Sequence, residues 1–382
     1  MSDIESQKGT DSPEEPSVPY LLEILVRDFH PVWNVGIVAA ALAGTLLYRF
    51  PYPANWLRVC GTIMFAIAVI MFFTITVVIL LKLYFYPHWK SLDEPQVSSF
   101  WGPYSVAFST MLNMLHYLFE NQDHTAIWVL WWVNIFMALF CGWFILLRVF
   151  TVAKMEGADI HGMLVLIVLP LVVVASTGAL MVPSLGNANS KLITMIVSFL
   201  LYSNGVLSGL CIVAVLYWKY ITHGLPPNAF VFTLFAPAGL FGHASWGILL
   251  QGKNIKEYLS DYQPQISPAI GEMFRFISLP VSLFFLGFGI WFTFLTFGGW
   301  VIRGRVPLGK VWFNLTFPLG ALSLPFHEVY TLLGFEAFRV VSVVYAVSCL
   351  IVVCVSLVSA LRAEFPLTKL KKIAASLTYK LT

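Results

Sequence analysis

Residues 161–182 read HGMLVLIVLPLVVVASTGALMV and combine the two features that decide the fold. A helix needs about 20 apolar residues to cross the hydrocarbon core of a bilayer, and this stretch supplies them without an Asp, Glu, Lys or Arg. It also carries Pro170 and a Ser176-Thr177-Gly178 group. A proline frees a backbone carbonyl that lipid cannot satisfy but a packed or watery interior can. The stretch therefore predicts a membrane helix that other helices shield from lipid.

Ten apolar stretches of membrane length follow one another along the 382 residues. Hydrophobic residues make up 59% of the chain and charged residues 11%, against roughly a quarter charged in soluble domains. This composition excludes a soluble enzyme and a disordered chain, and we predict an all-α membrane protein. The ten transmembrane helices are expected at 31–48, 58–85, 100–119, 127–149, 161–182, 191–218, 227–251, 273–299, 310–331 and 338–361.

The two ends of the chain differ from the apolar stretches. Residues 1–28 are expected to form a solvated acidic tail with a short helix, and residues 363–382 a basic tail. The transporter domain is expected to occupy residues 29–362. With ten spans both termini lie on one side of the membrane, and that side carries most of the 22 Lys and Arg residues. The positive-inside rule therefore predicts that both termini are cytoplasmic.

Proline and polar residues favour the odd-numbered stretches, whereas the even-numbered ones are nearly continuous Ile, Val, Leu, Phe and Trp. We predict five helical hairpins around a central pore, with the odd helices inside and the even helices outside, facing lipid. An alternative is that the small residues only allow helices to pack closely. The side chains expected to line the pore are Asn34, Thr45, Ser105, Ser109, His116, Ser176, Thr177, His243, Ser245, Asn314, Gly320 and Glu328.

The expected pore contains no Lys or Arg deep within an odd stretch. Such a pore can still conduct anions if the positive N-terminal ends of helices and backbone donors face its axis. The cytoplasmic rim is expected to carry Arg303, Arg305 and Lys310. Ionisable groups within a membrane are functional candidates, so Glu328, His327, His243 and His116 are candidate proton carriers. The alternative for each histidine is a hydrogen bond to a backbone carbonyl or water.

Enzyme chemistry finds little support in the sequence. His327-Glu328 resembles half of a zinc-protease motif, but position 331 is Thr where the second histidine would stand. The five cysteines have no paired ligand spacing, and the basic residues do not form a nucleic-acid surface. We therefore predict a protein that is not an enzyme, with no catalytic residue, metal site, cofactor or nucleic-acid partner.

Six blocks of sequence resemble the fungal sulfite efflux pumps. These pumps belong to a superfamily with bacterial tellurite-resistance proteins, fungal malate permeases (dicarboxylate transporters) and plant guard-cell slow anion channels. The resemblance implies a multi-pass plasma-membrane protein with ten helices in a hairpin repeat, assembled as a homotrimer with one pore in each subunit. The blocks are 50–58 (FPYPANWLR), 63–68 (IMFAIA), 170–176 (PLVVVAS), 231–235 (VFTLF), 254–258 (NIKEY) and 316–320 (TFPLG).

In relatives of known structure a phenylalanine on the ninth helix blocks the pore. The resemblance implies that Phe317, within Thr316-Phe317-Pro318, is this gate, with Phe313 as the second candidate. Related transporters often carry Gly-Thr-Gly in the first span, where this chain has Ala39-Ala40-Ala41. Contacts assigned to that glycine run are therefore not transferred to this sequence.

The expected function is export of sulfite or bisulfite from the cytosol, which would give sulfite resistance. A negative-inside membrane potential favours anion exit by about 2.3 kcal/mol per charge per 100 mV, so export needs no ATP, and proton coupling is left open. The alternatives are a malate or dicarboxylate permease and a general anion channel of the same superfamily. The expected partners are the sulfite or bisulfite anion, membrane lipid and further copies of the chain.

Overall fold

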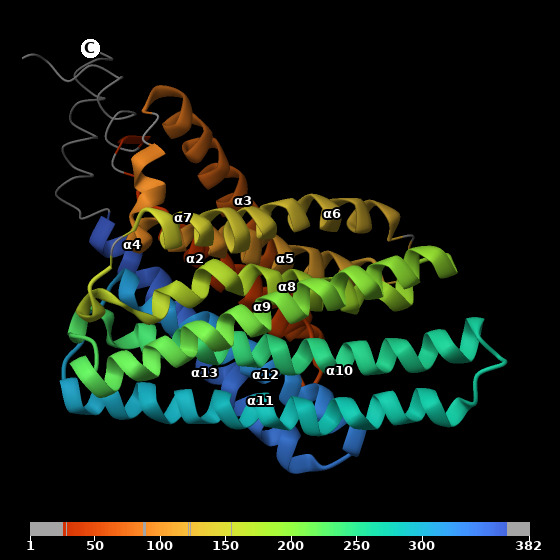
Figure 1. The fold of residues 1–382 in the computed structure, drawn as a ribbon. Coiled ribbons are helices and arrows are strands. Elements are labelled where there is room, and N and C mark those ends of the chain that lie inside the picture. The colour runs from red at the N-terminus through yellow and green to blue at the C-terminus, as the bar shows by residue number, and fades with distance from the viewer. Residues whose placement is uncertain are drawn as a thin grey trace, which may run out of the picture.

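The structure is a computed structural model that describes residues 26–27, 29–86, 89–120, 122, 124–153 and 155–364. Within these residues every regular element is a helix. The long helices α6, α8, α9, α10 and α11 run side by side roughly along one direction (Figure 1). The predicted tails, 1–28 and 363–382, lie almost wholly outside the described residues.

Each of the ten expected apolar stretches is occupied by a helix or by consecutive helical segments. In the fourth stretch α6 continues through the π-helix η3 (Phe140–Ile145) into α7 (Leu146–Thr151), and α4 (Pro95–Ser98) is a short connector between the second and third stretches. The other helices are α2 (Trp33–Tyr48), α3 (Asn55–Phe85), α5 (Gly102–Leu118), α6 (Thr125–Leu139), α8 (Val165–Met181), α9 (Ala188–His223), α10 (Ala236–Tyr262), α11 (Pro268–Arg303), α12 (Phe313–Leu333) and α13 (Glu336–Glu364).

Seven helical segments within the described residues are long and apolar enough to cross a membrane. The helix α2 is apolar but shorter, and α12 contains Pro318 and Pro325. The chain is therefore a multi-pass, all-α membrane protein. The seven segments are Asn55–Phe85, Thr125–Thr151, Gly162–Ser184, Ala188–His223, Asn228–Tyr262, Pro268–Arg303 and Glu336–Arg362.

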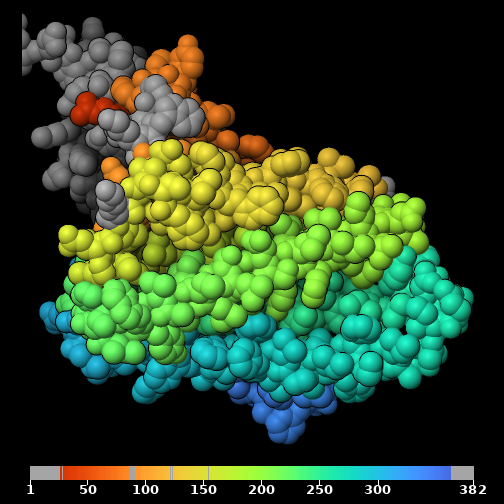
Figure 2. All heavy atoms as spheres, in the orientation of Figure 1, coloured from red at the N-terminus to blue at the C-terminus, as the bar shows by residue number. Residues whose placement is uncertain are grey.

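Burial alternates along the chain. The apolar window is 89% buried in Gly162–Ser184 and 94% buried in Asn228–Tyr262, but only 39% in the intervening Ala188–His223. The helices α2, α5 and α12 are also buried over most of their length. Large apolar side chains of α6, α9 and α11 are exposed, and these helices make up much of the face seen in Figure 2. Such a surface suits lipid, since lipid tails solvate aliphatic and aromatic groups.

The buried helices form a closed ring. Each contacts the next in the order α2, α5, α8, α10 and α12, and α12 contacts α2 in turn. The exposed helices pack outside this ring, with α3 against α2, α9 against α8, α11 against α10 and α13 against α12. The α2–α3 contact is close because Gly44 and Gly61 face each other: a Cβ at Gly61 would lie 2.7 Å from the Gly44 carbonyl oxygen.

Prolines and glycines join neighbouring buried helices by a repeated contact. Pro170 cannot donate to the carbonyl of Leu166, four residues before it, and Gly102 of α5 packs on that freed oxygen, where a Cβ would lie only 1.8 Å away. The contact between α10 and α12 is of the same kind, with Gly242, the Ala321 carbonyl and Pro325. A glycine also meets a carbonyl where the chain enters α8: a Cβ at Gly162 would lie 1.9 Å from the Thr233 carbonyl oxygen, which accepts from the Ala236 backbone.

Candidate functional site

A small cavity lies on the axis of the ring. Its volume is about 20 Å³, enough for about one water molecule. All five buried helices contribute to its wall, which is apolar except for Asn314. The residues that line it are Val35, Val38, Pro103, Val106, Leu166, Leu169, Ala236, Phe313, Asn314, Phe317 and Pro318.

These lining residues all belong to the first two turns of the five helices. Val35 and Val38 lie near the start of α2, Leu166 near the start of α8, and Ala236 is the first residue of α10. Short 3₁₀ segments lead into four of the helices and turn the chain toward the axis: η2 (Ser99–Trp101), η5 (Gly162–Leu164), η7 (Asn228–Phe235) and η8 (Lys310–Trp312). A helix N-terminus carries about half a positive charge, so five of them surround one point with a field that favours anions without a fixed cation.

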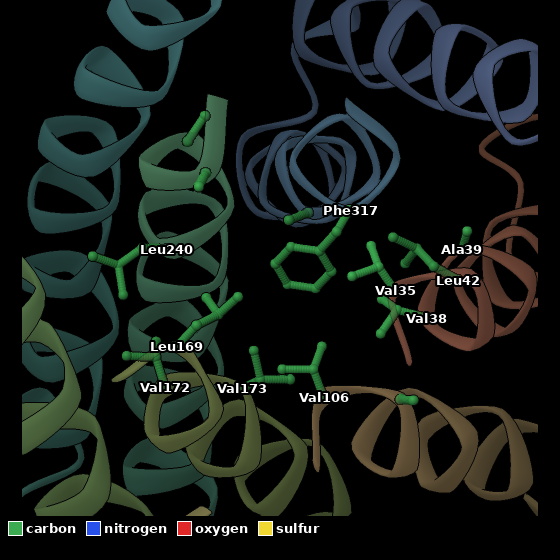
Figure 3. Close-up of a cluster of buried hydrophobic side chains, with 14 of the residues drawn as sticks. Val35, Val38, Ala39, Leu42, Val106, Leu169, Val172, Val173, Leu240 and Phe317 are labelled. Atoms are coloured by element: carbon green, nitrogen blue, oxygen red, sulfur yellow. The ribbon is translucent and has the colours of Figure 1, made fainter. Parts of the chain in front are cut away.

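The Phe317 side chain lies on the axis of the ring of buried helices. Its ring projects from α12 between Val35, Val38, Val106 and Leu169 (Figure 3), and its side chain is 5% exposed. On the side of α10 the ring lies parallel to the imidazole of His243, with 5.2 Å between the ring centres. Sequence placed Phe317 on the ninth helix, and the structure places it at the centre of the ring of buried helices.

Phe313 lies one turn nearer the start of α12 and also lines the cavity. Its ring centre is 6.3 Å from that of Trp33, and the ammonium of Lys310 is 5.3 Å from the Trp33 ring. The two other residues expected at the rim lie along the 224–228 loop: Arg303 donates to the carbonyl of Leu225, and the carbonyl of Arg305 accepts from Asn228. Lys310 is thus the rim cation that the structure brings to the aromatic entrance of the cavity.

Several hydroxyls expected on the axis instead join inner to outer helices. The Ser105 hydroxyl donates to Asn134 Oδ1 of α6 at 2.7 Å, and Asn134 Nδ2 donates to Ser109 Oγ at 2.7 Å. Ser245 pairs with Ser282 of α11 at 2.6 Å. A buried hydroxyl takes the nearest polar partner, and here that partner lies on an outer helix. A pore-lining role for these three serines stays a prediction.

The remaining polar residues of the inner helices have mixed surroundings. Asn34 Nδ2 donates to the carbonyl of Phe100, and Thr45 donates to the carbonyl of Ala41 within α2. The Thr177 hydroxyl is buried without a hydrogen-bond partner among the described residues. Gly320 provides close packing, since a Cβ there would lie 2.4 Å from Leu42 Cδ2. Asn34 Oδ1 is likewise buried without a partner among the described residues, so it can accept from a water, and the Thr177 hydroxyl can bind a water or an anion.

His116 and Glu328 lie at the far end of the ring from the cavity. The His116 ring centre is 4.8 Å from that of His124, and Arg49 acts on both His116 and His327 electrostatically. Three cations, Arg49, Lys253 and Arg275, act on the partly buried carboxylate of Glu328. These cations form a basic mouth around Glu328 at this end, where Glu120 beside Tyr117 and Glu336 beside Arg339 add two further carboxylates.

Sequence reasoning passed over the apolar lining and Gly239. A Cβ at Gly239 would lie 2.7 Å from Phe317 Cδ1 and 2.8 Å from Cε1, so this glycine provides the space that the gate ring occupies. The available signal was a small residue four positions, about one turn, before His243 on a buried helix. Within the described residues no group of three or more His, Cys, Asp and Glu side chains is placed to hold a metal ion.

Two histidines outside the spans have altered pKa values. Burial lowers the pKa of His30, and Lys310 and Lys82 lower it further by charge repulsion. Burial likewise lowers the pKa of His161, which Lys219 reinforces. His30 is consequently neutral at neutral pH, and its Nδ1 accepts a hydrogen bond from the backbone of Val32 at 3.1 Å, just before α2 begins.

A ring of buried helices that start around one cavity, inside a coat of apolar helices, is the architecture of a membrane protein that passes small solutes. The chain belongs to the voltage-dependent anion channel family, SLAC1, which matches residues 28–361.

Three relatives illustrate the similarity. The chain is 27% identical over 389 residues to the sulfite efflux pump SSU1 of Saccharomyces cerevisiae, covering 85% of each chain. It is 26% identical over 363 residues to the sulfite efflux pump SSU1 of Candida albicans, covering 87% of this chain and 73% of the relative. An uncharacterised transporter of Methanocaldococcus jannaschii is 24% identical over 326 residues, covering 82% of this chain and 89% of the relative. The resemblance to the sulfite efflux pumps expected from sequence is confirmed.

Proposed function

We propose that this chain is a plasma-membrane exporter of sulfite or bisulfite. Its ten helices would cross the membrane as five hairpins, and the anion would pass along the axis of the buried ring. One observation carries the proposal: the first two turns of all five buried helices line a single cavity, with Phe317 in its wall. The names of the fungal relatives supply the anion.

The electrostatics of the path suit export of an anion. Sulfite would approach past Lys310 and Trp33 and enter the cavity, where the five helix N-termini stabilise negative charge. No Lys or Arg is among the residues that line the cavity, so the anion would be held weakly and released readily. The membrane potential then drives it outward.

The gate must move before an anion passes. A cavity of about 20 Å³ holds about one water, whereas sulfite has four heavy atoms. Rotation of the Phe317 side chain would join the cavity to the outer half of the axis. Phe313 is the second candidate gate, at the entrance side of the same cavity.

Flux through purified protein in liposomes tests the proposal. With an imposed potential, sulfite should leave the vesicles at a rate that rises with the voltage. Phe317→Ala should raise this rate about tenfold, which corresponds to removing ~1.4 kcal/mol from the barrier, and Phe313→Ala should raise it less. Wild-type vesicles that release no sulfite under voltage would contradict the function, and an unchanged rate for Phe317→Ala would contradict the gate.

A dicarboxylate permease is the alternative that the cavity disfavours. Two carboxylates are normally held by fixed cations, and the cavity wall offers one amide, Asn314, among apolar groups. Excess malate should leave sulfite flux unchanged. Strong competition by malate would favour the permease, and equal flux of sulfite, nitrate and chloride would favour a general anion channel.

The basic mouth at the far end is the proposed exit, and Glu328 is its candidate proton carrier. Protonation would neutralise its carboxylate among Arg49, Lys253 and Arg275. If transport is proton-coupled, a pH gradient alone should drive sulfite flux, and Glu328→Gln should abolish that flux while voltage-driven flux remains. If a pH gradient alone drives no sulfite flux, proton coupling is contradicted and export is driven by voltage alone.

The proposed topology and assembly have their own tests. Cytoplasmic termini place terminal tags out of reach of reagents added to intact cells. A homotrimer should give a cross-linked product of three chains in native membranes and in detergent. Labelling of the tags from outside, or a single-chain species alone, would contradict these two proposals.

A further inference from the structure

We propose that His243 is a latch that holds the Phe317 ring in its blocking position, and that Ser176 fixes the latch. The inference rests on the proposed gating role of Phe317. The imidazole and the phenyl ring are parallel, with an interplanar angle of 0° and 5.2 Å between centres. Aromatic pairs of this kind contribute beyond the area they bury.

The imidazole is itself held on two further sides. Its Nδ1 lies 3.1 Å from Ser176 Oγ of α8, and the Trp246 ring packs edge-on against it, with centres 5.6 Å apart. His243 is only 2% exposed. The latch therefore joins three buried helices: Ser176 lies on α8, His243 on α10 and Phe317 on α12.

The hydrogen bonds around Ser176 fix the direction of the latch bond. The single hydroxyl proton of Ser176 is donated to the carbonyl of Val172 at 2.8 Å. Its oxygen is then left to accept from the Nδ1–H of a neutral His243. This bond sets the orientation of the imidazole plane, and the imidazole plane sets that of the Phe317 ring.

Gly239 holds the other edge of the ring in place. It lies one turn before His243 on α10, and its missing side chain leaves room for Phe317 Cδ1 and Cε1. The phenyl ring thus sits in a slot on α10 whose floor is Gly239 and whose wall is His243. Opening requires the ring to leave both.

Sulfite flux in liposomes under a fixed potential measures the latch in two backgrounds, with Phe317 and with Phe317→Ala. With Phe317 present, His243→Ala should raise flux roughly 2- to 10-fold, the factor that loss of an aromatic pair produces. His243→Phe keeps a ring in the stack and should stay within about twofold of wild type. In the Phe317→Ala background none of these substitutions should change flux.

Ser176→Ala supplies an independent variant should His243→Ala fail to fold. It removes the hydroxyl that orients the imidazole, and should raise flux by a smaller factor that also depends on Phe317. Gly239→Ala supplies another. A methyl group there displaces the phenyl ring and should alter flux only when Phe317 is present. Its control is Gly287→Ala on α11, where nothing lies within 4 Å of an added Cβ.

The outcomes separate the latch from the gate. If Phe317→Ala raises flux but His243→Ala and Ser176→Ala leave it at the wild-type level, the latch is overturned and the gate stands. If His243→Ala raises flux equally in both backgrounds, His243 acts on the path directly and the latch is again overturned. If Phe317→Ala itself has no effect, the proposed gate fails first.

Discussion

The neighbouring helices α10 and α11 show what burial does to a membrane helix. Both are long enough to span a bilayer and they pack along each other. The apolar window of the α10 segment is 94% buried and that of α11 is 33% buried. Yet α10 is the less apolar of the two, with Gly239, Gly242, His243 and Ser245, whereas α11 is rich in Phe, Leu and Trp.

The difference teaches that a buried membrane helix can carry polar and small residues, although it need not: the α8 segment is 89% buried and still strongly apolar. Only lipid-facing helices need uniformly apolar side chains, because buried helices can satisfy polar groups and freed carbonyls among themselves. Phe317 and the two residues that contact its ring on α10, His243 and Gly239, all lie on buried helices. The effect of replacing a glycine also depends on whether its helix is buried or faces lipid.

The largest expected effect comes from placing the same methyl group in each kind of helix. At Gly162 a Cβ would lie 1.9 Å from the carbonyl oxygen of Thr233. Backbone cannot yield as a side chain can, so Gly162→Ala should lower the free energy of unfolding by about 3 kcal/mol or more. At Gly287 of α11 nothing lies within 4 Å, and Gly287→Ala should raise it by up to about 1 kcal/mol.

Thermal unfolding of the two variants in detergent checks this pair. Loss of folded protein is an acceptable result for Gly162→Ala, because Gly287→Ala controls for expression and handling. Equal midpoints for the two variants would contradict the close contact between Gly162 and the Thr233 carbonyl.

An intermediate effect is expected where a polar side chain of an outer helix forms hydrogen bonds with an inner helix. Asn134→Leu removes the partner of Ser105 and Ser109 and should cost about 1–2 kcal/mol. Asn204→Leu breaks the exposed contact between Asn204 and Trp143 at 3.2 Å and should cost little. Detergent unfolding of both variants, together with Asn134→Leu/Ser105→Ala/Ser109→Ala, measures the difference.

The triple variant should recover part of the loss, since it leaves no hydroxyl unpaired. Sulfite flux should be unchanged by Asn134→Leu, because the network faces α6 and not the cavity. A large change in flux would mean that Ser105 and Ser109 line the path after all.

The smallest expected effect is a difference in the pH dependence of stability between residues at the starts of two helices, the outer helix α9 and the inner helix α2. The outer helix α9 is capped by Asn187, whose side chain accepts from the Ser190 backbone at 2.7 Å, so Asn187→Ala should cost about 1 kcal/mol at any pH. The inner helix α2 is preceded by neutral His30, which accepts from Val32. Its lowered pKa means that this contribution is present above the ordinary pKa of 6.5 and is lost as the pH falls below it.

Unfolding midpoints at pH 8 and pH 5 should show this contrast. The difference between wild type and His30→Ala should shrink on acidification, while that for Asn187→Ala should stay constant. A His30→Ala difference that is independent of pH would show that the bond to Val32 contributes nothing.

The sequence determined the class of protein and the positions of its helices. Uninterrupted apolar length predicts membrane helices, and their loops and turns are marked by Pro51-Tyr52-Pro53 and similar groups. The six sequence blocks also indicated the family, which the match over 28–361 confirms. These properties depend on amino-acid composition and on the order of residues within each stretch, and both can be read directly from the sequence.

Tertiary structure alone decided which partner each buried polar group meets. Ser105 and Ser245 have the same chemistry as Ser176, but they form hydrogen bonds with α6 and α11, whereas Ser176 meets His243. The side chains that line the cavity are mostly apolar. The polarity of the cavity comes instead from the backbone N–H groups at the starts of the helices that form its wall. A proline kink changes the direction in which side chains point before and after it. The spacing of residues in the sequence therefore could not predict which neighbouring helix each side chain would contact.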